Sequence, residues 1–360
     1  MTHDCLKLTT YCAERDRAGD RFVPDALLEL YAAHGFEASV LLRGAEGFGK
    51  RDRLQTQRLL TLAEDLPAVT VAVDTRERIQ AALPEVETLM AHGLVTVERA
   101  RMIAGGADPA PRSEELDPQT KLTVYCGRQE RSRGRPAYVE VVDVLHRHGV
   151  AGATVLLGVD GTAHGVRQRA RFFGRNAEVP LMIISIGSAA DIAGALPELA
   201  AALPRPLMTL ERVVVCKRDG ALLAQPLHLP ETDESGLGIW QKLMVYAGEQ
   251  SRHGRHPLYV ELIRRLRDAG ADGATALRGI WGYHGDHAPH GDRLLSLRRH
   301  VPIVTVVVDT PSRIQRWWRI VDEVTGETGL VTSEIVPASR AGGGASDRGG
   351  LRLARHRRHH

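Results

Sequence analysis

Lysine is scarce in this 360-residue sequence: only 5 of its 47 lysine and arginine residues are lysines. A compositional bias of a bacterial genome explains this ratio without any functional cause. Aromatic residues make up 4% of the chain, so the core must be mainly aliphatic. The net charge is only +3, and much of it lies in the last twenty residues. The near-neutral remainder argues against a nucleic-acid-binding body, which would carry a concentrated basic face.

Cysteine pairs and long apolar runs are also missing. Four dispersed cysteines without a C-x-x-C pair argue against a disulfide framework or a structural zinc site. No apolar run approaches the roughly 20 residues that span a bilayer. The first residues lack the basic stretch and apolar segment of a secretory signal. We therefore expect a soluble cytoplasmic protein, with Cys12 and Cys126 as buried, unreactive thiols.

One segment occurs three times in the chain. Three stretches match one another without a gap for nearly forty residues, and the match resumes after a loop of differing length. Such a repeat indicates three copies of one structural unit. The first block runs from Lys7, Lys121 and Lys242 to Gly44, Gly158 and Gly279, and the second runs from Pro67, Pro180 and Pro302 to Glu98, Glu211 and Glu334.

Each copy has the pattern of a βαββαβ unit. In the first copy, Ala26, Leu27, Leu30 and Tyr31 fall at helical spacing, and Gly35 favours a left-handed helix end. The nearly continuous apolar run "VTVAVDT" is typical of a strand in the middle of a sheet. This order predicts an α+β fold of three ferredoxin-like units, with Tyr11, Tyr125 and Tyr246 in the cores.

Polar segments rich in proline and glycine separate the copies. At about 3.3 Å per residue they are long enough to reach around a small domain, so the units can close a ring. We predict repeats at residues 1–104, 119–217 and 240–340, linkers at 105–118 and 218–239, and a disordered basic tail at 341–360.

The motifs K-L-T-x-Y, "LLRGAEGFG", "LPEVETLM" and "GLVTVE" resemble the DUF190 family, which is grouped with the PII-like signalling proteins. The resemblance covers nearly all of residues 6–103. The third copy keeps it in "ALRGIWGYHG" and "VPIVTVVVDTPSRI", whereas the second departs in "LLGVDGTAHGVRQRARFFG".

This resemblance implies a homotrimer of ferredoxin-like units. It also implies that small effectors, often adenine nucleotides, bind in clefts between subunits, and that a loop between the second and third strands reports occupancy. A membrane protein of the fluoride-exporter type is the implied candidate partner. Because three units share one chain here, we expect an intrachain pseudo-trimer that stays monomeric, with three clefts free to diverge.

The loop expected at residues 43–58 combines glycine with positive charge. Glycine backbones can turn N–H groups toward an anion, and basic side chains attract it. A solvated connector would have the same composition, and the spacing matches neither a P-loop nor G-x-G-x-x-G. The predicted ligand-binding residues here are Arg43, Gly44, Gly47, Gly49, Lys50, Arg51 and Arg53.

The corresponding loop of the third copy, residues 278–293, adds aromatic residues to the candidates Arg278 and Gly279. Trp281 and Tyr283 can stack on a nucleobase or insert into a partner, or else pack against their own domain. His284, His287 and His290 are suitable ligands for zinc, copper or nickel. Because Pro289 interrupts them and the other copies lack the set, we expect no metal site.

Arg17, Arg131 and Arg252 recur between the first strand and the first helix. Arginine can clamp a phosphate or carboxylate with two hydrogen bonds, or it can hold two domains together. The sequence leaves both roles open, and we include all three arginines among the candidate ligand-binding residues.

Two functions remain compatible with these sequence features. The first is a PII-like regulatory protein without enzymatic activity, which binds a small effector such as an adenine nucleotide between repeats and signals through the connecting loops. The second is a non-catalytic adaptor that binds a membrane transporter without a small ligand. No Ser-His-Asp order, carboxylate pair or metal-hydrolase signature recurs in the three copies, so an enzyme is disfavoured.

Overall fold

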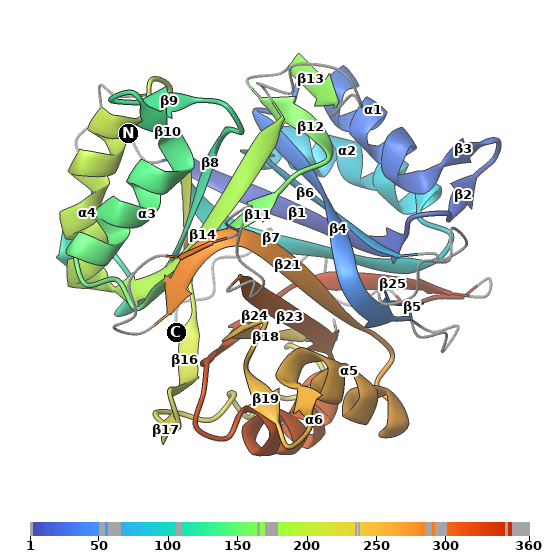
Figure 1. The fold of residues 1–360 in the computed structure, drawn as a ribbon. Helices are drawn as coiled ribbons and strands as arrows, with labels where there is room; N and C mark the ends of the chain where they lie inside the picture. The colour runs from blue at the N-terminus through green and yellow to red at the C-terminus, as the bar shows by residue number, and fades with distance from the viewer. Residues whose placement is uncertain are drawn as a thin grey trace.

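Three βαββαβ repeats build the chain in the computed structural model (Figure 1), which confirms the predicted α+β fold of ferredoxin-like units. The structure describes residues 3–49, 55–56, 66–105, 110–163, 166–169, 179–234, 236, 238–284, 290–291, 301–342 and 345–347.

Each repeat contains a four-stranded antiparallel sheet in which the second, third, first and last strands are neighbours in that order. The first repeat comprises β1 (His3–Ala13), α1 (Val23–Ala33), β4 (Ala38–Phe48), β6 (Pro67–Thr75), α2 (Arg76–Leu89) and β7 (Gly93–Ala104). The second comprises β8 (Gln119–Gly127), α3 (Ala137–Arg147), β11 (Gly152–Leu157), β14 (Pro180–Ser188), α4 (Ala189–Ala202) and β15 (Leu207–Arg212). The third comprises β18 (Gln241–Gly248), α5 (Leu258–Asp268), β21 (Ala274–His284), β23 (Pro302–Asp309), α6 (Pro311–Thr325) and β24 (Leu330–Ile335).

Short strands supplement this frame. A two-residue hairpin precedes the first helix of every repeat, and further strands extend or flank the main sheets. The hairpins are β2 (Arg17–Ala18) with β3 (Arg21–Phe22), β9 (Arg131–Ser132) with β10 (Arg135–Pro136), and β19 (Arg252–His253) with β20 (His256–Pro257). The others are β5 (Gln55–Thr56), β12 (Asp160–Ala163), β13 (Val166–Arg169), β16 (Val214–Arg218), β17 (Ala221–Leu222), β22 (His290–Gly291), β25 (Ala338–Gly342) and β26 (Ala345–Asp347), with a 3-10 helix η1 (Ser113–Glu115).

The predicted end of the first helix at Gly35 is confirmed. Gly35 follows α1 with a φ of +60°, a left-handed conformation that glycine adopts without strain. Thr75 and Ser188 occupy the N-cap positions of α2 and α4, and the Ser188 side chain accepts a hydrogen bond from the backbone N–H of Asp191. Prolines 84 and 197 lie inside these two helices, yet neither helix is divided there.

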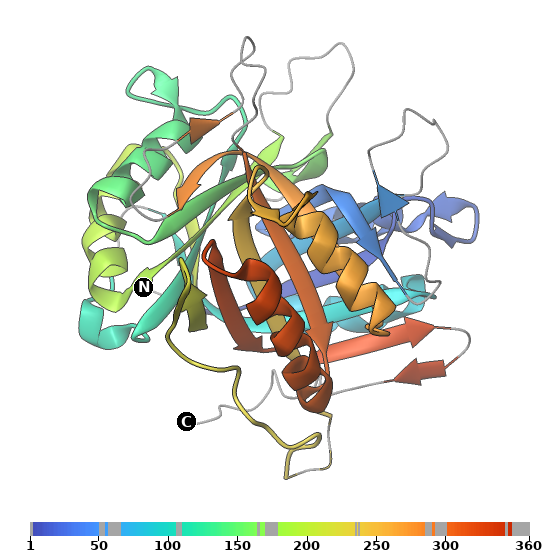
Figure 2. The same ribbon diagram turned by 60° about the horizontal axis from the view of Figure 1, so that its bottom comes forward.

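The repeats close into a ring through two sets of strand pairs, which confirms the expected pseudo-trimer (Figures 1 and 2). In the second-strand seams, the end of one repeat's second strand pairs with the start of a neighbour's second strand. The order around the ring is first repeat to third, third to second, and second to first. These seams join β4 to β21, β21 to β11, and β12 to β4. In the last-strand seams, β7 pairs with β15, β16 with β24, and β25 with β7.

The helix pairs lie on the outside of the ring and the sheets face its axis (Figure 1). One apolar core on the axial side draws buried residues from all three repeats, while a separate core lies beneath each helix pair. In the described part of the chain, none of the helices is long and apolar enough to cross a bilayer. The axis and the spaces between repeats are therefore the places where residues of different copies meet.

Candidate functional site

Six charged side chains from the three repeats meet at the axis, and we call them the axial ring. Each repeat contributes one lysine from its first strand and one glutamate from its last strand, opposite each other in the antiparallel ladder. Every one of these side chains is at most 8% exposed. The members of the axial ring are Lys7, Lys121, Lys242, Glu98, Glu211 and Glu334.

Positive and negative groups alternate around the axial ring. The Nζ atom of Lys121 lies 2.9 Å from Glu211 of its own repeat and 2.5 Å from Glu334 of the next repeat. Likewise, the Nζ atom of Lys242 lies 3.0 Å from Glu334 and 2.8 Å from Glu98. Lys7 completes the ring through Glu98 and Glu211. Each lysine thereby joins two repeats.

At Glu98 and Lys121 these contacts outweigh the effect of burial on the pKa. Burial alone would raise the pKa of Glu98, but Lys242, Lys7 and Lys121 outweigh it and hold that pKa well below its usual range. The glutamates likewise outweigh burial at Lys121 and raise its pKa. At Lys242 burial prevails and lowers the pKa.

The three carboxylates also lie close enough together to hold a metal ion. However, each already has lysine ammonium partners, and three positive charges balance three negative ones. A further cation would have to displace a lysine from a buried pair, which is costly. The arrangement therefore serves as an ion-pair hub between the repeats, and we assign no metal to it.

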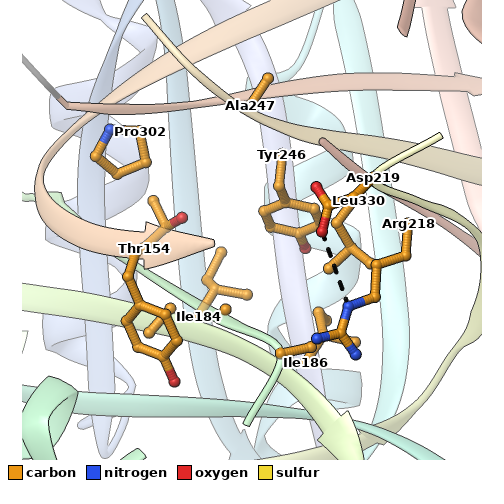
Figure 3. Close-up of a pocket in the computed structure, with 13 residues that line it drawn as sticks. Thr154, Ile184, Ile186, Arg218, Asp219, Tyr246, Ala247, Pro302 and Leu330 are labelled. Atoms are coloured by element: carbon orange, nitrogen blue, oxygen red, sulfur yellow. Dashed lines mark ion pairs between the residues drawn. The ribbon is translucent and has the colours of Figure 1, made fainter. Parts of the chain in front are cut away.

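A cleft lies between the second and third repeats. Its enclosed volume is small, about 20 Å³, and the wider hollow around it is open to solvent. Figure 3 shows Arg218 and Asp219 on one side, with Thr154 and Pro302 on the other. The remaining walls are mainly apolar, formed by Ala151, Gly152, Ala153, Ile184, Ile186, Tyr246, Ala247, Tyr283 and Leu330.

The charged side of this cleft belongs to a hairpin found in the second repeat. Strands β16 and β17 pair at Arg218 and Ala221, and the turn contains Asp219 and Gly220, both with positive φ. Asp219 donates its backbone N–H to the carbonyl of Gly329, which fastens the turn to the third repeat. The Arg218 Nε atom lies 4.0 Å from the Asp219 carboxylate, which is a loose pair. The guanidinium can therefore turn toward an anion in the cleft.

Two predicted ligand residues, Arg43 and Arg278, occupy equivalent strand positions and form equivalent ion pairs. Arg43 contacts Glu14, and the Nη2 atom of Arg278 lies 2.7 Å from Glu249. The second repeat has replaced both members of this pair. The residues at its corresponding positions are Arg128 and Leu157.

The predicted loop glycines lie in strands, so their placement in a loop is wrong. Gly44 and Gly47 are part of β4, and Gly279 is part of β21. A Cβ atom at Gly44 would lie 2.8 Å from the Pro67 side chain, and one at Gly47 would lie 2.7 Å from the Ala274 carbonyl oxygen. Glycine permits these strands to approach closely. Gly49 is exposed at the end of β4, whereas Lys50, Arg51 and Arg53 lie outside the described residues.

Trp281 and Tyr283 likewise lie in β21 rather than in a loop. Tyr283 does not pack against its own domain, because its ring is buried in the core of the second repeat. Neighbouring repeats supply its environment, which a single repeat's sequence cannot reveal. The backbone of His284 ends β21, His290 lies in β22, and His287 lies outside the described residues.

The three recurrent arginines have one shared local contact. Each donates from Nη1 to the carbonyl oxygen three residues further on, across the turn of its own hairpin. These bonds measure 3.0 Å at Arg17, 2.8 Å at Arg131 and 3.0 Å at Arg252. The guanidinium groups thus brace the approach to the first helix, and their role as ligand residues stays a prediction.

The expectations for cysteine and tyrosine are largely confirmed. All four cysteines are free, and Cys126 is buried, with a pKa that burial raises. Cys12 is only half-buried. Tyr125 and Tyr246 are buried in the axial core, against which the half-buried Tyr11 packs.

The model of the DUF190 family, described as Uncharacterized ACR, COG1993, matches residues 5–102, 119–215 and 240–338. A UPF0166 protein of Aquifex aeolicus (strain VF5) is 30% identical over 95 residues, which cover 26% of this chain and 88% of that protein. Each matched stretch corresponds to one βαββαβ repeat of the structure.

Among solved structures, an aspartate kinase from Synechocystis aligns with 94% of this chain at 12% identity and a TM-score of 0.24. The alignment covers 45% of the kinase chain, so this chain spans less than half of its length.

Proposed function

This chain belongs to the DUF190 family, and from that premise we propose that it is a PII-like regulatory protein without enzymatic activity. In this proposal a small effector, such as an adenine nucleotide, binds between repeats. The segments that join the second and third strands then report its presence to a partner protein.

The cleft between the second and third repeats carries this proposal. Its lining includes Tyr283 and Pro302, and these residues flank the segment that joins β21 to β23. A ligand in the cleft would contact both ends of that segment. Its binding energy can therefore favour one arrangement of the segment over another, which is what a signalling protein needs.

The axial ring is unsuited to ligand binding. Shifted pKa values occur at catalytic sites and also in structural ion-pair networks. In the described residues, the axial ring combines strong shifts with almost complete burial. We therefore interpret these groups as structural and place ligand binding in the cleft.

Replacing Arg218 by alanine should weaken the binding of an anionic effector without lowering stability. A hydrogen bond to a charged group contributes about 1.5–3 kcal/mol, so Kd should rise roughly tenfold to a hundredfold. Arg218 is 43% exposed and only loosely paired, so Tm should stay unchanged. Isothermal titration with ATP, ADP, AMP and S-adenosylmethionine measures the first effect, and thermal melting measures the second.

Arg205→Ala serves as the control, because it removes an exposed arginine that does not line the cleft. If both variants change Kd equally, overall charge rather than the cleft governs binding. If none of the four compounds binds the unaltered protein, the proposal of an adenine-type effector fails.

We also propose that the chain acts as a monomer. The closed ring pairs the second and last strands of each repeat within the same polypeptide. Analytical ultracentrifugation should show one species of 39.4 kDa over a hundredfold dilution into the low micromolar range. A species near three chain masses that dissociates on dilution would contradict this proposal.

A second candidate function is a non-catalytic adaptor for a membrane transporter of the fluoride-exporter type. The linker after the second repeat exposes three leucine side chains. Their exposed fractions are 55% at Leu222, 60% at Leu223 and 42% at Leu227. Exposed apolar side chains close together often mark protein-binding surfaces. Binding of a transporter that is unaffected by effectors but lost after Leu222→Ser and Leu223→Ser would favour this candidate.

A further inference from the structure

The second-strand seams place a side chain of each repeat inside the neighbouring repeat. Three residues occupy the same position in the three copies of the second strand, and we call them the keys. All three are buried, and each faces a small residue across its seam. The keys and their partners are Phe48 with Ala274, Tyr283 with Ala153, and Thr162 with Ser39.

The second and third repeats each receive an aromatic key. Tyr283 lies in the core of the second repeat, where its hydroxyl donates to the carbonyl oxygen of Val150 at 2.8 Å. Its ring meets that of His146 edge-on, with 4.9 Å between centroids. Phe48 lies in the core of the third repeat with Ala271, the counterpart of Val150. Val150 and Ala271 have side chains small enough to leave room for these rings.

The first repeat supplies its own aromatic ring instead. Phe36 stands where the other repeats have valine or alanine, and it is fully buried. Its ring stacks on Tyr31 with 5.3 Å between centroids. The key that reaches this repeat is the small Thr162, whose hydroxyl donates to the Oγ atom of Ser39 at 2.9 Å.

We infer that these seams select their partners, so that each repeat accepts only one particular repeat as the donor of its key. Every outer core contains one aromatic ring at this place, from its own repeat in the first case and from a neighbour in the other two. Reversing the order of the ring would bring Tyr283 against Phe36 and would face Thr162 toward the open space beside Ala271. Overpacking and an empty cavity both destabilise a core.

The same residues act against seams between like repeats of different chains. Three first repeats joined in the observed manner would place Phe48 against Phe36 at every seam. Three second repeats would leave the space beside Val150 unfilled, because Thr162 is too small to occupy it. Selectivity here comes from a repulsive contact as well as an attractive one.

Variants of the full-length chain test the inference at the seam between the second and first repeats. Ser39→Ala is made in every variant and in the reference, so that the residue across the seam matches the other repeats. Thr162→Phe should lower Tm by about 5 °C because Phe36 already fills the space. Phe36→Val should lower it by a similar amount by leaving a cavity. The double variant should recover most of either loss, since the neighbour now supplies the ring.

The reciprocal pair, Phe48→Thr with Ala271→Phe, tests the seam between the first and third repeats in the same way. Melting curves of the single and double variants form a double-mutant cycle at each seam. Sedimentation of each variant shows whether the chain remains a single-chain particle. Recovery at both seams supports the inference. Additive losses, a double variant less stable than both single variants, or no loss from Thr162→Phe would each overturn it.

Discussion

Lys121→Met is expected to lower the free energy of unfolding by about 3–5 kcal/mol, because it leaves buried carboxylates without their counter-charge. The lysine side chain is 1% exposed, and its ammonium lies between Glu211 and Glu334 of two different repeats. Methionine has a similar size, so the loss reports the missing charge rather than a cavity. Chemical denaturation at neutral pH measures it.

Two comparisons separate charge balance from other causes. Lys217→Met also removes a buried lysine, 7% exposed, but the Asp322 carboxylate that it leaves behind is 43% exposed and can be solvated by water, so the loss should be clearly smaller than for Lys121→Met. Adding Glu211→Gln to Lys121→Met restores neutrality in the axial ring and should recover part of the loss. If the double variant loses as much as the two single variants together, the six groups do not act as one ring.

Gly161→Ala is expected to be among the most destabilising small substitutions in the chain, at about 3 kcal/mol. A Cβ atom at this position would lie 2.1 Å from the carbonyl oxygen of Ser39 in the neighbouring repeat. Backbone cannot yield as a flexible side chain does, so the seam between β12 and β4 must separate. Thermal and chemical denaturation should both show the loss.

Gly49→Ala is the matched control, since a Cβ atom there would have nothing within 4 Å. It should leave Tm unchanged, or raise it slightly through the lower entropy of the unfolded chain. Equal losses for the two variants would mean that close approach at the seam is not what requires glycine at position 161.

The repeat architecture follows from the sequence because its signals are local and occur three times. Helix ends at Gly35 and strand runs such as residues 67–75 depend on neighbouring residues only. The axial ring has no such local signal, because its members lie about ninety residues apart within each repeat. A signal was nevertheless present: three of only five lysines interrupt apolar strands at equivalent positions. The rest of the chain uses arginine almost exclusively. Lysine at the same strand position in all three repeats therefore indicates that this position needs a compact ammonium group.

The second strands show why other expectations failed. Glycine and charge after residue 42 are typical of a loop, yet β4 continues to Phe48. The added length is stable because the third repeat supplies a strand partner, which the sequence of one copy cannot reveal. Tyr283 is buried for the same reason, since its environment comes from the second repeat.

The last-strand seams bear on the genetic history of the chain. Strand β25, at the far end of the third repeat, returns to pair with β7 of the first. The ring of repeats is therefore closed and has no first member in space. The linkers determine only the order in which the repeats follow one another along the chain. A circular permutant that starts at the second repeat would rebuild the same contacts, so gene rearrangements of this kind are compatible with one and the same particle.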